Sequence, residues 1–365
     1  GLKMITTINN KHKKLNVPNL RFPEFKGEWH LCKISNILRI GNGRDYKHLA
    51  KGNIPVFGTG GYMTSVNDYL YDGETTFIGR KGTINKPYYY KGKFWTVDTL
   101  FYTHSFDGIM PHFVYCLFQT INWLKYNEAS GVPSLSKDTI EKIKVHIPQI
   151  KEQQKISRLI LLLDERIATQ NKIIEDLKKL KSAISKKLLS NDKWTTYKIQ
   201  DIAEIGRGRV ISSVEIDRQK HPLYPVYSSQ TSNDGIMGYL DNYMFDGEYI
   251  TWTTDGANAG TVFYRKGKFN CTNVCGTLKI QPRFDCYFVS LVLQQATQKY
   301  VSSNLANPKL MNNTMASIKI RMPNIETQKQ LSKVFQTLDS CLLVHQRTCK
   351  MYLSEKQYLL RQMLI

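Results

Sequence analysis

The sequence predicts an α+β fold in which two tandem mixed α/β modules alternate with two long helices. The helices are expected to pair as an antiparallel coiled coil, with a pseudo-twofold axis relating the two halves of the chain. Three observations support this prediction: an internal repeat, a change within each copy from strand-like to helix-like composition, and heptad-like apolar spacing at the end of each copy.

The repeat is clearest where residues 32–44, CKISNILRIGNGR, return as residues 197–209, YKIQDIAEIGRGR. Later segments also match, but their offset grows from 165 to 175 residues, so the second copy has gained residues in loops. These later matches include Ile54–Phe57 with Tyr224–Tyr227, Lys91–Phe94 with Lys266–Phe269, Pro148 with Pro323 and Leu163-Asp164 with Leu338-Asp339.

The first part of each copy has the composition of short strands separated by turns. Runs such as Thr75–Ile78 and Tyr249–Thr253 are rich in β-branched and aromatic residues, and Gly, Asn and Asp punctuate them. We therefore expect one module over residues 17–148 and a second over 191–323, after an N-terminal tail at 1–16.

The last part of each copy, 149–190 and 324–365, contains neither Gly nor Pro and is predicted to be a long helix. About 38 helical residues would form a rod of roughly 57 Å, which needs a helical partner. An antiparallel pair is favoured because residues 190–192 lead straight into the second module, whereas a parallel pair needs a long return of the chain. The predicted contact positions are Ile160, Leu163, Ile167, Ile174, Leu177 and Ile184 in the first helix, and Phe335, Leu338, Leu342, Tyr352 and Leu359 in the second.

The formal net charge of +21 indicates a polyanionic partner, most simply nucleic acid. Residues 1–190 carry +14 and residues 191–365 carry +7, so the excess is not confined to one tail. The alternative is a basic proteome in which such a charge has no specific meaning. The longest aliphatic run, Leu159–Leu163, is too short to span a membrane, and no signal peptide is recognisable, so a cytoplasmic location without membrane attachment is expected.

No catalytic or metal-binding constellation stands out. Cys271 and Cys275 have no second Cys/His pair at zinc-ligand spacing, so buried thiols are favoured over a metal site. A nuclease-like set of Asp72, Glu74 and Lys81 is not completed in the second copy, and a turn explains the acidic residues. Phosphate-loop, methyltransferase and His-Glu-x-x-His motifs are missing from the sequence.

The two copies differ most in polar loops that suit the reading of DNA bases. One copy carries Arg and Lys, which suit guanine, where the other carries Gln, Asn, Thr and Asp, which suit adenine or cytosine. Ordinary loop drift is the alternative. The base-readout candidates are Thr59, Tyr62, Arg80, Lys81, Thr83, Ser134 and Ser136 in the first module, and Ser228, Gln230, Thr231, Thr253, Thr254, Asp255, Asn258 and Asn312 in the second.

A second set of basic residues suits phosphate contacts, which position a protein on DNA without specifying sequence. The candidates are Arg44, Lys47, Lys51, Lys86, Arg209, Lys266, Lys268 and Lys309. The chain is thus expected to read DNA. A scaffold that uses its repeats to bind two protein partners without DNA, and a self-contained enzyme, are the other classes.

From residue 17 to the C-terminus, the chain resembles the DNA-specificity subunit of type I restriction-modification systems. The resemblance rests on Trp29 and Trp194, each followed by Gly-x-Gly, and on two matching helix starts. These starts are Ile147-Pro148 leading to Gln153, Ile156 and Leu163-Asp164, and Met322-Pro323 leading to Gln328, Leu331 and Leu338-Asp339. The second helix departs from the first with His345 and Cys349 at the positions of Gln170 and Ile174, which leaves the helix register open.

The resemblance implies a non-catalytic subunit whose two target-recognition domains each read one half of a split, asymmetric site in double-stranded DNA. It implies that the paired helices set the gap between the halves and dock two methyltransferase subunits, with two restriction-translocase subunits in the full complex. It also implies that this chain binds no cofactor, and that S-adenosylmethionine, ATP and Mg belong to the partner subunits.

Overall fold

The computed structural model describes residues 5–6, 16–189, 191–302 and 307–365. The predicted N-terminal tail, 1–16, lies mostly outside the described residues. The chain divides into two compact units, one formed by Gly1–Lys172 with Gln346–Ile365 and the other by Ile173–His345. Each long helix therefore contributes a segment to both units.

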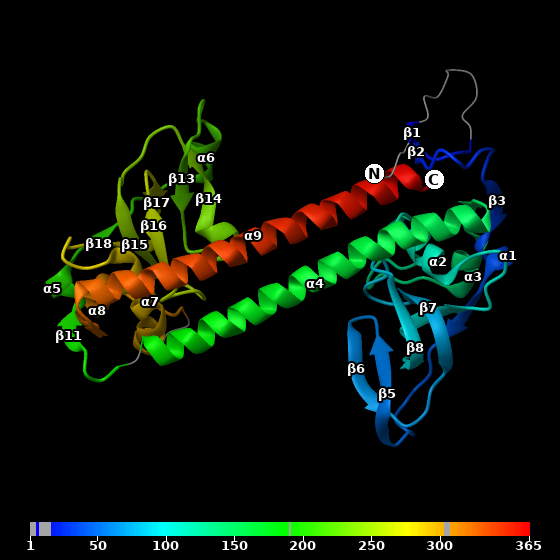
Figure 1. Cartoon of the computed structure of the whole chain (residues 1–365), viewed down its shortest axis with the longest axis horizontal. Coiled ribbons are helices and arrows are strands. Elements are labelled where there is room, and N and C mark those ends of the chain that lie inside the picture. The colour runs from blue at the N-terminus through cyan, green and yellow to red at the C-terminus, as the bar shows by residue number, and fades with distance from the viewer. Residues whose placement is uncertain (1–4, 7–15, 190, 303–306) are drawn as a thin grey trace. The chain divides into compact units, whose positions relative to one another are not determined.

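The first unit contains a six-stranded mixed sheet in the order β4-β9-β7-β8-β5-β6 (Figure 1). All its neighbours are antiparallel except β5 and β8, which are parallel. The strands are β4 (Arg39–Asn42), β5 (Lys51–Gly58), β6 (Gly61–Val66), β7 (Tyr71–Gly79), β8 (Tyr88–Thr96) and β9 (Leu100–His104). Two short pairs stand apart, β1 (Ile5–Thr6) with β2 (Leu20–Arg21) and β3 (His30–Lys33) with β10 (Lys144–Ile147). The helices of this module are α1 (Ile34–Ile37), α2 (Pro111–Phe118), η1 (Trp123–Tyr126) and α3 (Lys137–Lys142).

The second unit repeats this plan with a divided sheet. Its strands form a four-stranded sheet β12-β18-β15-β16, a three-stranded sheet β14-β13-β17 and a pair β11-β19. They are β11 (Thr195–Lys198), β12 (Ala203–Arg207), β13 (Tyr224–Tyr227), β14 (Ile236–Leu240), β15 (Glu248–Thr253), β16 (Val262–Lys266), β17 (Asn270–Cys271), β18 (Cys275–Ile280) and β19 (Lys319–Met322). The helices are α5 (Ile199–Ile202), α6 (Ser213–Asp217), η2 (Ser232–Gly235), α7 (Cys286–Ala296), η3 (Thr297–Tyr300) and α8 (Asn312–Ser317).

The division of the second sheet has a local cause. In the first unit the nine-residue strand β8 pairs antiparallel with β7 and parallel with β5, and so joins the two parts of one sheet. In the second unit the equivalent stretch is interrupted, and β16 pairs with β15 whereas β17 pairs with β13. The repeat therefore preserves strand pairing and direction while one strand is broken.

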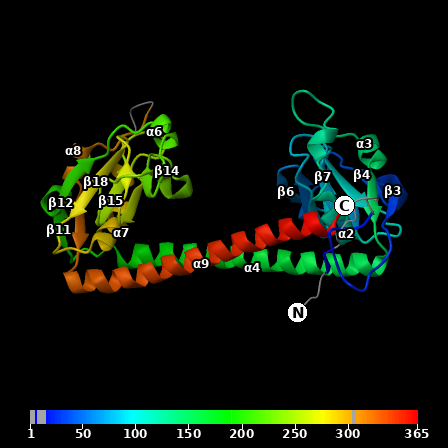
Figure 2. The same ribbon diagram turned by 90° about the horizontal axis from the view of Figure 1, so that it is seen from above.

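Equivalent aromatic pairs mark the two module cores. Trp29 meets Phe113 edge-on at 6.2 Å between ring centroids, and Trp194 meets Phe288 edge-on at 5.9 Å. The phenylalanines lie in α2 and α7, which pack on their own sheets in the two views (Figures 1 and 2). The repeated tryptophans therefore pack each module's core against a helix, Trp29 as a buried residue and Trp194 as a half-buried one.

Both predicted long helices are present, α4 as Ile150–Leu188 and α9 as Ile325–Met363, each with 39 residues. A buried glutamine anchors the first turn of each. Gln153 Nε2 donates to Pro148 O at 2.9 Å, and its Oε1 accepts from Met110 N at 2.9 Å. Gln328 makes the matching contacts with Pro323 O and Asp285 N, at 2.8 and 3.0 Å. These contacts tie each helix to the start of α2 or α7.

Within each unit, a segment of α4 lies beside a segment of α9 (Figures 1 and 2). In the first unit Asp164 contacts Lys356 and Asn171 contacts Cys349, so residue numbers increase along α4 in the direction in which they decrease along α9. The pairing is therefore antiparallel, as predicted. All eleven predicted contact positions are buried or half-buried. Ile160, Leu163 and Leu359 join the first module's core, and Phe335, Leu338 and Ile184 join the second.

Candidate nucleic-acid interface

The repeated Gly-x-Gly-Arg segments are structural turns at the ends of β4 and β12. A Cβ added to Gly43 would lie 1.9 Å from Val97 O, and one added to Gly208 would lie 2.1 Å from Cys271 O. Only glycine permits this backbone approach. Arg44 N donates to Thr96 O at 2.7 Å, and Arg209 N donates to Cys271 O at 3.2 Å. These second glycines therefore serve the packing of the module, and the arginine side chains remain exposed beside them.

In the first module, three loops converge at one end of the sheet. Gly58 pairs with Gly61, so Thr59 and Gly60 form a two-residue turn between β5 and β6. A cavity of about 820 Å³ is lined by Lys47, Thr59 and Asp98, among others. Arg80 approaches the same loops, because its N donates to Thr99 O at 2.8 Å and its Nη1 to Asp98 O at 3.3 Å.

The loop that follows β7 is clamped to the segment before α3. Lys81 and Ser134 form an antiparallel backbone bridge, Leu135 N donates to Arg80 O at 2.9 Å, and Gly82 N donates to Pro133 O at 2.8 Å. Thr83 is exposed on this loop. The structure thus brings Arg80, Lys81, Thr83 and Ser134 together. Ser136 lies next to them, but its hydroxyl accepts from Thr139 N and caps α3.

The second module builds the same clamp with different side chains. Asp255 and Lys309 form the bridge, Leu310 N donates to Thr254 O at 2.9 Å, and Gly256 N donates to Pro308 O at 3.0 Å. Asp255 thus occupies the position of Lys81. Its carboxylate lies 3.6 Å from Lys309 Nζ and also accepts a hydrogen bond from Asn307. At this one place the first module is cationic and the second presents a carboxylate.

The connection between β13 and β14 carries Ser228, Gln230 and Thr231, and it is longer than its counterpart in the first module. Eight residues, 228–235, separate the strands. Ser228 N donates to Gly235 O at 2.8 Å, and Asn258 Nδ2 donates to Ser229 O at 3.2 Å. Asn258 and the 228–235 loop are therefore in direct contact.

Several candidates lie elsewhere or below the surface. Thr253 and Thr254 are only 1% and 0% exposed, so in this conformation their side chains do not reach solvent. Asn312 is half-buried, and its Nδ2 points to Gly206 O at 3.4 Å. Tyr62 is 64% exposed on β6, with its hydroxyl 3.1 Å from Ser65 Oγ.

The phosphate candidates do not form one set. Arg44, Lys47 and Lys51 are exposed. Lys47 lines the cavity with Thr59, whereas Lys51 begins β5 at the opposite end of that strand from Thr59. Arg209 forms a two-point ion pair with Glu215, which lowers the pKa of that carboxyl. Lys266 pairs with Glu248 at 3.2 Å at the start of β15, whereas Asp255 follows the end of that strand. Lys268 Nζ lies 4.5 Å from the centroid of the Tyr243 ring, within cation–π range. Lys86 lines a groove against α9.

A residue that the sequence interpretation missed lies between the repeated glycines. Arg207 is exposed, donates from Nε to Asn273 O and places Nη2 3.4 Å from Thr254 Oγ1. It occupies the x of Gly206-x-Gly208, where the first module has Asn42. Comparing the residue between the two glycines in each copy, Asn42 and Arg207, would have identified this arginine from the sequence.

Two grooves recur at equivalent places in the units. In the second unit, Gln294 and Gln295 at the end of α7 face Ser182, Ser185 and Lys186 of α4. In the first unit, the corresponding groove lies between the end of α2 and the last turns of α9, and its lining includes Gln119, Thr120, Gln357, Leu360 and Arg361. Each groove combines polar and cationic side chains with part of a long helix.

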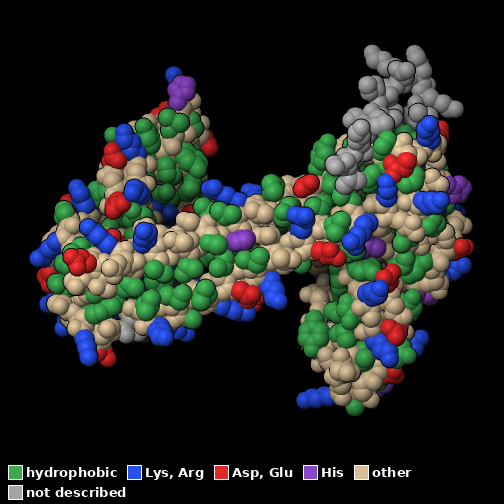
Figure 3. All heavy atoms as spheres, viewed as in Figure 1, with side chains coloured by type: hydrophobic (Ala, Val, Ile, Leu, Met, Phe, Trp, Pro, Cys, Tyr) green, Lys and Arg blue, Asp and Glu red, His purple; other side chains and the backbone are tan. Residues whose placement is uncertain are grey.

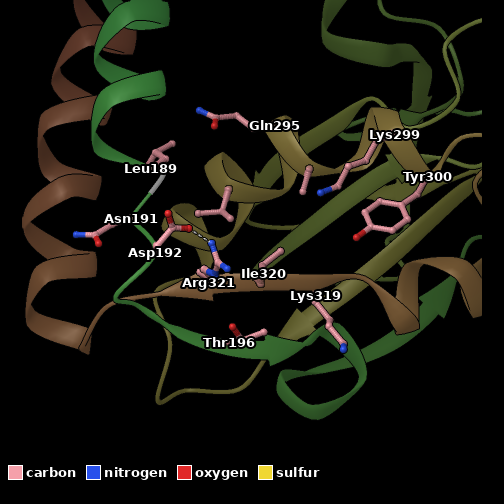
Figure 4. A pocket seen from close by; sticks show the side chains of 12 residues that line it. Leu189, Asn191, Asp192, Thr196, Gln295, Lys299, Tyr300, Lys319, Ile320 and Arg321 are labelled. Carbon is pink, nitrogen blue, oxygen red and sulfur yellow. Dashed lines mark hydrogen bonds and ion pairs between the residues drawn. The ribbon is translucent and has the colours of Figure 1, made fainter.

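A further groove of about 640 Å³ lies in the second unit where α4 leads into β11 (Figure 4). Its walls include Lys299, Lys319 and Arg321, and Arg321 is paired with Asp192 (Figure 4). No base-readout candidate lines it. The groove is therefore separate from the divergent loops.

Other classes of site find little support in the described ranges. There, His, Cys, Asp and Glu side chains form no group of three that could hold a metal ion. None of the helices in the same ranges combines the length and apolar character that a bilayer crossing requires. Burial raises the pKa of Cys275 to about 11, as expected for a thiol in a packed strand.

Comparison with known proteins agrees with the duplicated architecture. The family described as "Type I restriction modification DNA specificity domain" matches residues 26–179 and again 191–350. The chain is 36% identical over 215 residues to the putative type I specificity subunit S.MpnORF365P of Mycoplasma pneumoniae, which covers 57% of this chain and 80% of that protein. It is 42% identical over 146 residues to the type I restriction enzyme MpnII specificity subunit of the same organism, covering 40% of this chain and 44% of that one.

Among solved structures, the S subunit of a type I restriction-modification system from M. genitalium has the same fold. The TM-score is 0.76 at 16% identity, covering 96% of this chain and 99% of that one. The fold and the family match define a class of proteins built from two tandem DNA-specificity domains. The chain belongs to the type I restriction-modification DNA specificity family.

Proposed function

We propose that this chain is the DNA-reading subunit of a type I system and recognises a bipartite, asymmetric site in double-stranded DNA. It directs methyltransferase and restriction subunits to that site and performs no catalysis itself. Family membership and the +21 net charge support this proposal. Cationic side chains attract the phosphate backbone whatever its sequence.

The observation that carries the proposal is the contrast between Lys81 and Asp255. Both residues occupy the same bridge in equivalent loops, yet their charges are opposite, and Asp255 is paired with Lys309 where Lys81 faces Ser134. A shared frame with opposed chemistry at its tip is what two readers of different half-sites need. A frame that bound the same partner twice would have no reason to reverse this charge.

The polar side chains of the divergent loops assign different bases to the two modules. Arg80 and Lys81 in the first module suit the O6 and N7 acceptors of guanine. Gln230 and Asn258 in the second suit adenine, and Asp255 suits the amino group of cytosine. Arg44, Lys47 and Lys51 would contact phosphates and fix the first module on the duplex.

Partner subunits would dock on the long helices. Six large apolar side chains of α9 are between 44% and 59% exposed, and hydrophobic surface is visible along the helices in Figure 3. They are Val334, Leu343, Val344, Met351, Leu353 and Tyr358. Surfaces of this kind favour a protein partner. A solved structure that concerns complex assembly of the type I R-M system shares this fold at a TM-score of 0.52 and 10% identity, which supports the same proposal.

The proposed partners are two methyltransferase subunits and two restriction-translocase subunits. S-adenosylmethionine, ATP and Mg would be bound by those partners rather than by this chain. A complex that modifies chromosomal DNA would act in the cytoplasm.

A scaffold that binds two proteins without DNA is the other candidate, supported by the same exposed face of α9. Salt distinguishes the two. A reader assembled with its methyltransferase loses DNA affinity with a log–log slope of roughly one unit per phosphate contact. If the assembled complex binds DNA with no salt dependence or not at all, the scaffold replaces the reader. Sequencing of methylated adenines in a host that carries the chain would then identify the two half-sites.

A further inference from the structure

The loop 228–235 of the second module has an unusual backbone. Three successive residues, Asn233, Asp234 and Gly235, have φ values of 51°, 52° and 81°. Glycine adopts this left-handed region readily, but for Asn and Asp it costs free energy. Such a conformation persists only when surrounding contacts hold it.

One of those contacts comes from beneath the loop. Arg265 of β16 donates from Nη2 to Asp234 O at 2.7 Å and from Nε to Thr251 Oγ1 at 3.2 Å. Its guanidinium carbon lies 3.6 Å from the centroid of the Tyr227 ring and 4.4 Å from that of Phe263. The planar group is thus sandwiched between two rings and aimed at the left-handed segment.

Arg265 is only 7% exposed, so it is not placed to contact DNA itself. It lies immediately beside Gly235, because a Cβ added there would be 3.3 Å from Arg265 Nη2 and 3.1 Å from Gln230 O. On its other side, the loop carries Gln230, whose Nε2 donates to Ile236 O. A base-readout candidate and the buried arginine therefore act on the same few peptide groups.

The first module shows what the same place looks like without this loop. Thr75 and Tyr249 occupy equivalent positions of the repeat, each directly after a matching glutamate. Thr75 pairs with Tyr90 and Tyr249 pairs with Arg265, so Tyr90 is the counterpart of Arg265. Tyr90 packs on Phe57 at 4.9 Å and on Phe77 at 5.9 Å between centroids. The three aromatic residues Phe57, Phe77 and Tyr90 of the first module correspond to Tyr227, Thr251 and Arg265 of the second.

The two differences go together. Where the supporting cluster is aromatic, the strands are joined by a two-residue turn, Thr59-Gly60; where it holds a buried guanidinium, they are joined by eight residues. A hydrogen-bond donor beneath the loop is needed only by the longer connection, whose carbonyls would otherwise face a closed aromatic surface.

We propose that Arg265 is a positioning residue that sets the target preference of the second module by holding the loop 228–235 in its left-handed conformation. The proposal rests on the proposed function, since it assigns the loop a part in reading DNA. Lysine cannot replace it, because one ammonium group cannot stack between two rings and donate in two fixed directions at once.

The experiment compares Arg265→Lys and Arg265→Tyr in the full chain with the exposed control Lys279→Met on β18. Hydrogen exchange of the free chain is measured first. In both Arg265 variants, amides within 228–236 should exchange at least roughly tenfold faster while those of β15 and α7 remain protected. The control should match the wild type. Unchanged protection of the loop in both variants would overturn the proposal.

The second measurement assembles each variant with its methyltransferase and records adenine methylation on DNA in which either half-site is randomised. The base preference should broaden in one half-site and stay unchanged in the other. Uniformly weaker methylation with both preferences intact would assign Arg265 a merely structural role and overturn the proposal. If the wild type itself shows no sequence preference while loop exchange still responds, the proposed function fails and the loop-holding contact stands.

A variant in the loop itself tests the same contact without a substitution in the sheet. Gly235→Ala forces a side chain into a positive-φ position and against Arg265 Nη2 without altering β16. It should broaden the same half-site as Arg265→Lys. An effect on the opposite half-site, or on neither, would count against the proposal.

Discussion

Lys356 Nζ lies 2.6 Å from Asp164 Oδ1 and 3.1 Å from the hydroxyl of Tyr115, so one lysine joins α9 to α4 and to α2. Its side chain is 9% exposed. Burial lowers its pKa, but Tyr115 and Asp164 outweigh burial, and the pKa lies above its ordinary value. The ammonium group therefore remains charged inside the first unit.

The same contact exists in the second unit with the helices exchanged. Lys181 of α4 pairs with Asp339 of α9, and Tyr287 donates to the same aspartate at 2.6 Å. Lys181 and Lys356 are separated by 175 residues, as are Asp164 and Asp339. The repeat thus supplies each helix with one aspartate and one lysine, and an antiparallel pair satisfies both.

Replacement of Lys356 by Met should destabilise the first unit. Removing one partner leaves Asp164 and Tyr115 without their donor, and for a largely buried pair we expect a loss of roughly 2–4 kcal/mol. The exposed Lys350→Met is the matched control on the same helix. Thermal unfolding of the full chain measures the effect, and an unchanged transition would show that apolar contacts alone hold the register.

Replacement of Lys181 by Met should cost less, on the order of 1 kcal/mol, because its side chain is 25% exposed and that of Asp339 is 39% exposed. Asp339→Asn should cost more than Lys181→Met, since Asp339 also accepts from Tyr287. Unfolding of both variants under the same conditions gives the comparison. A larger loss for Lys181→Met than for Lys356→Met would contradict this ranking by burial.

Gly43→Ala and Gly208→Ala should each destabilise their own module by about 1–3 kcal/mol or more, because the new methyl group overlaps a backbone carbonyl. Gly60→Ala is the control, since a Cβ there meets nothing within 4 Å. Unfolding and DNA binding should be measured together. If Gly43→Ala kept full stability and lost only DNA affinity, the glycine would serve DNA approach rather than packing.

Arg80→Ala should weaken recognition of one half-site, and Gln230→Ala or Asn258→Ala should weaken recognition of the other. Each lost base contact is expected to reduce discrimination by about 1–3 kcal/mol. Methylation profiles on randomised half-sites measure this directly. Equal weakening of both halves by any one of these changes would refute the assignment of one module to each half.

Thr253→Val provides an internal check on the interface. Because this hydroxyl is 1% exposed, its removal should leave half-site preference unchanged. The exposed Thr231 is the comparison, and Thr231→Val is expected to alter preference in the second half-site only. The same methylation profile serves both variants, and a changed preference in Thr253→Val would mean that the loop opens on DNA.

The sequence by itself determined the duplication, the alternation of modules and helices, and the antiparallel pairing. The duplication follows from the repeated segments, and the antiparallel pairing follows from the short connection at 190–192. The helices follow from periodic patterns such as Ile160, Leu163 and Ile167, which specify a buried face before any contact is known. The long helices begin two residues after Pro148 and Pro323, and neither helix contains a glycine or a proline.

Only the tertiary structure decided which polar side chains are exposed and which are buried against partners from distant segments. Thr253 and Thr254 are polar residues of the kind expected in a DNA-contacting loop, but the fold buries both side chains. Lysine and arginine are usually exposed, yet Lys356 and Arg265 are buried because hydroxyl, carbonyl and carboxylate groups from distant segments accept their hydrogen bonds. Whether a polar side chain faces solvent depends on partners brought by the fold, and local sequence does not encode those partners.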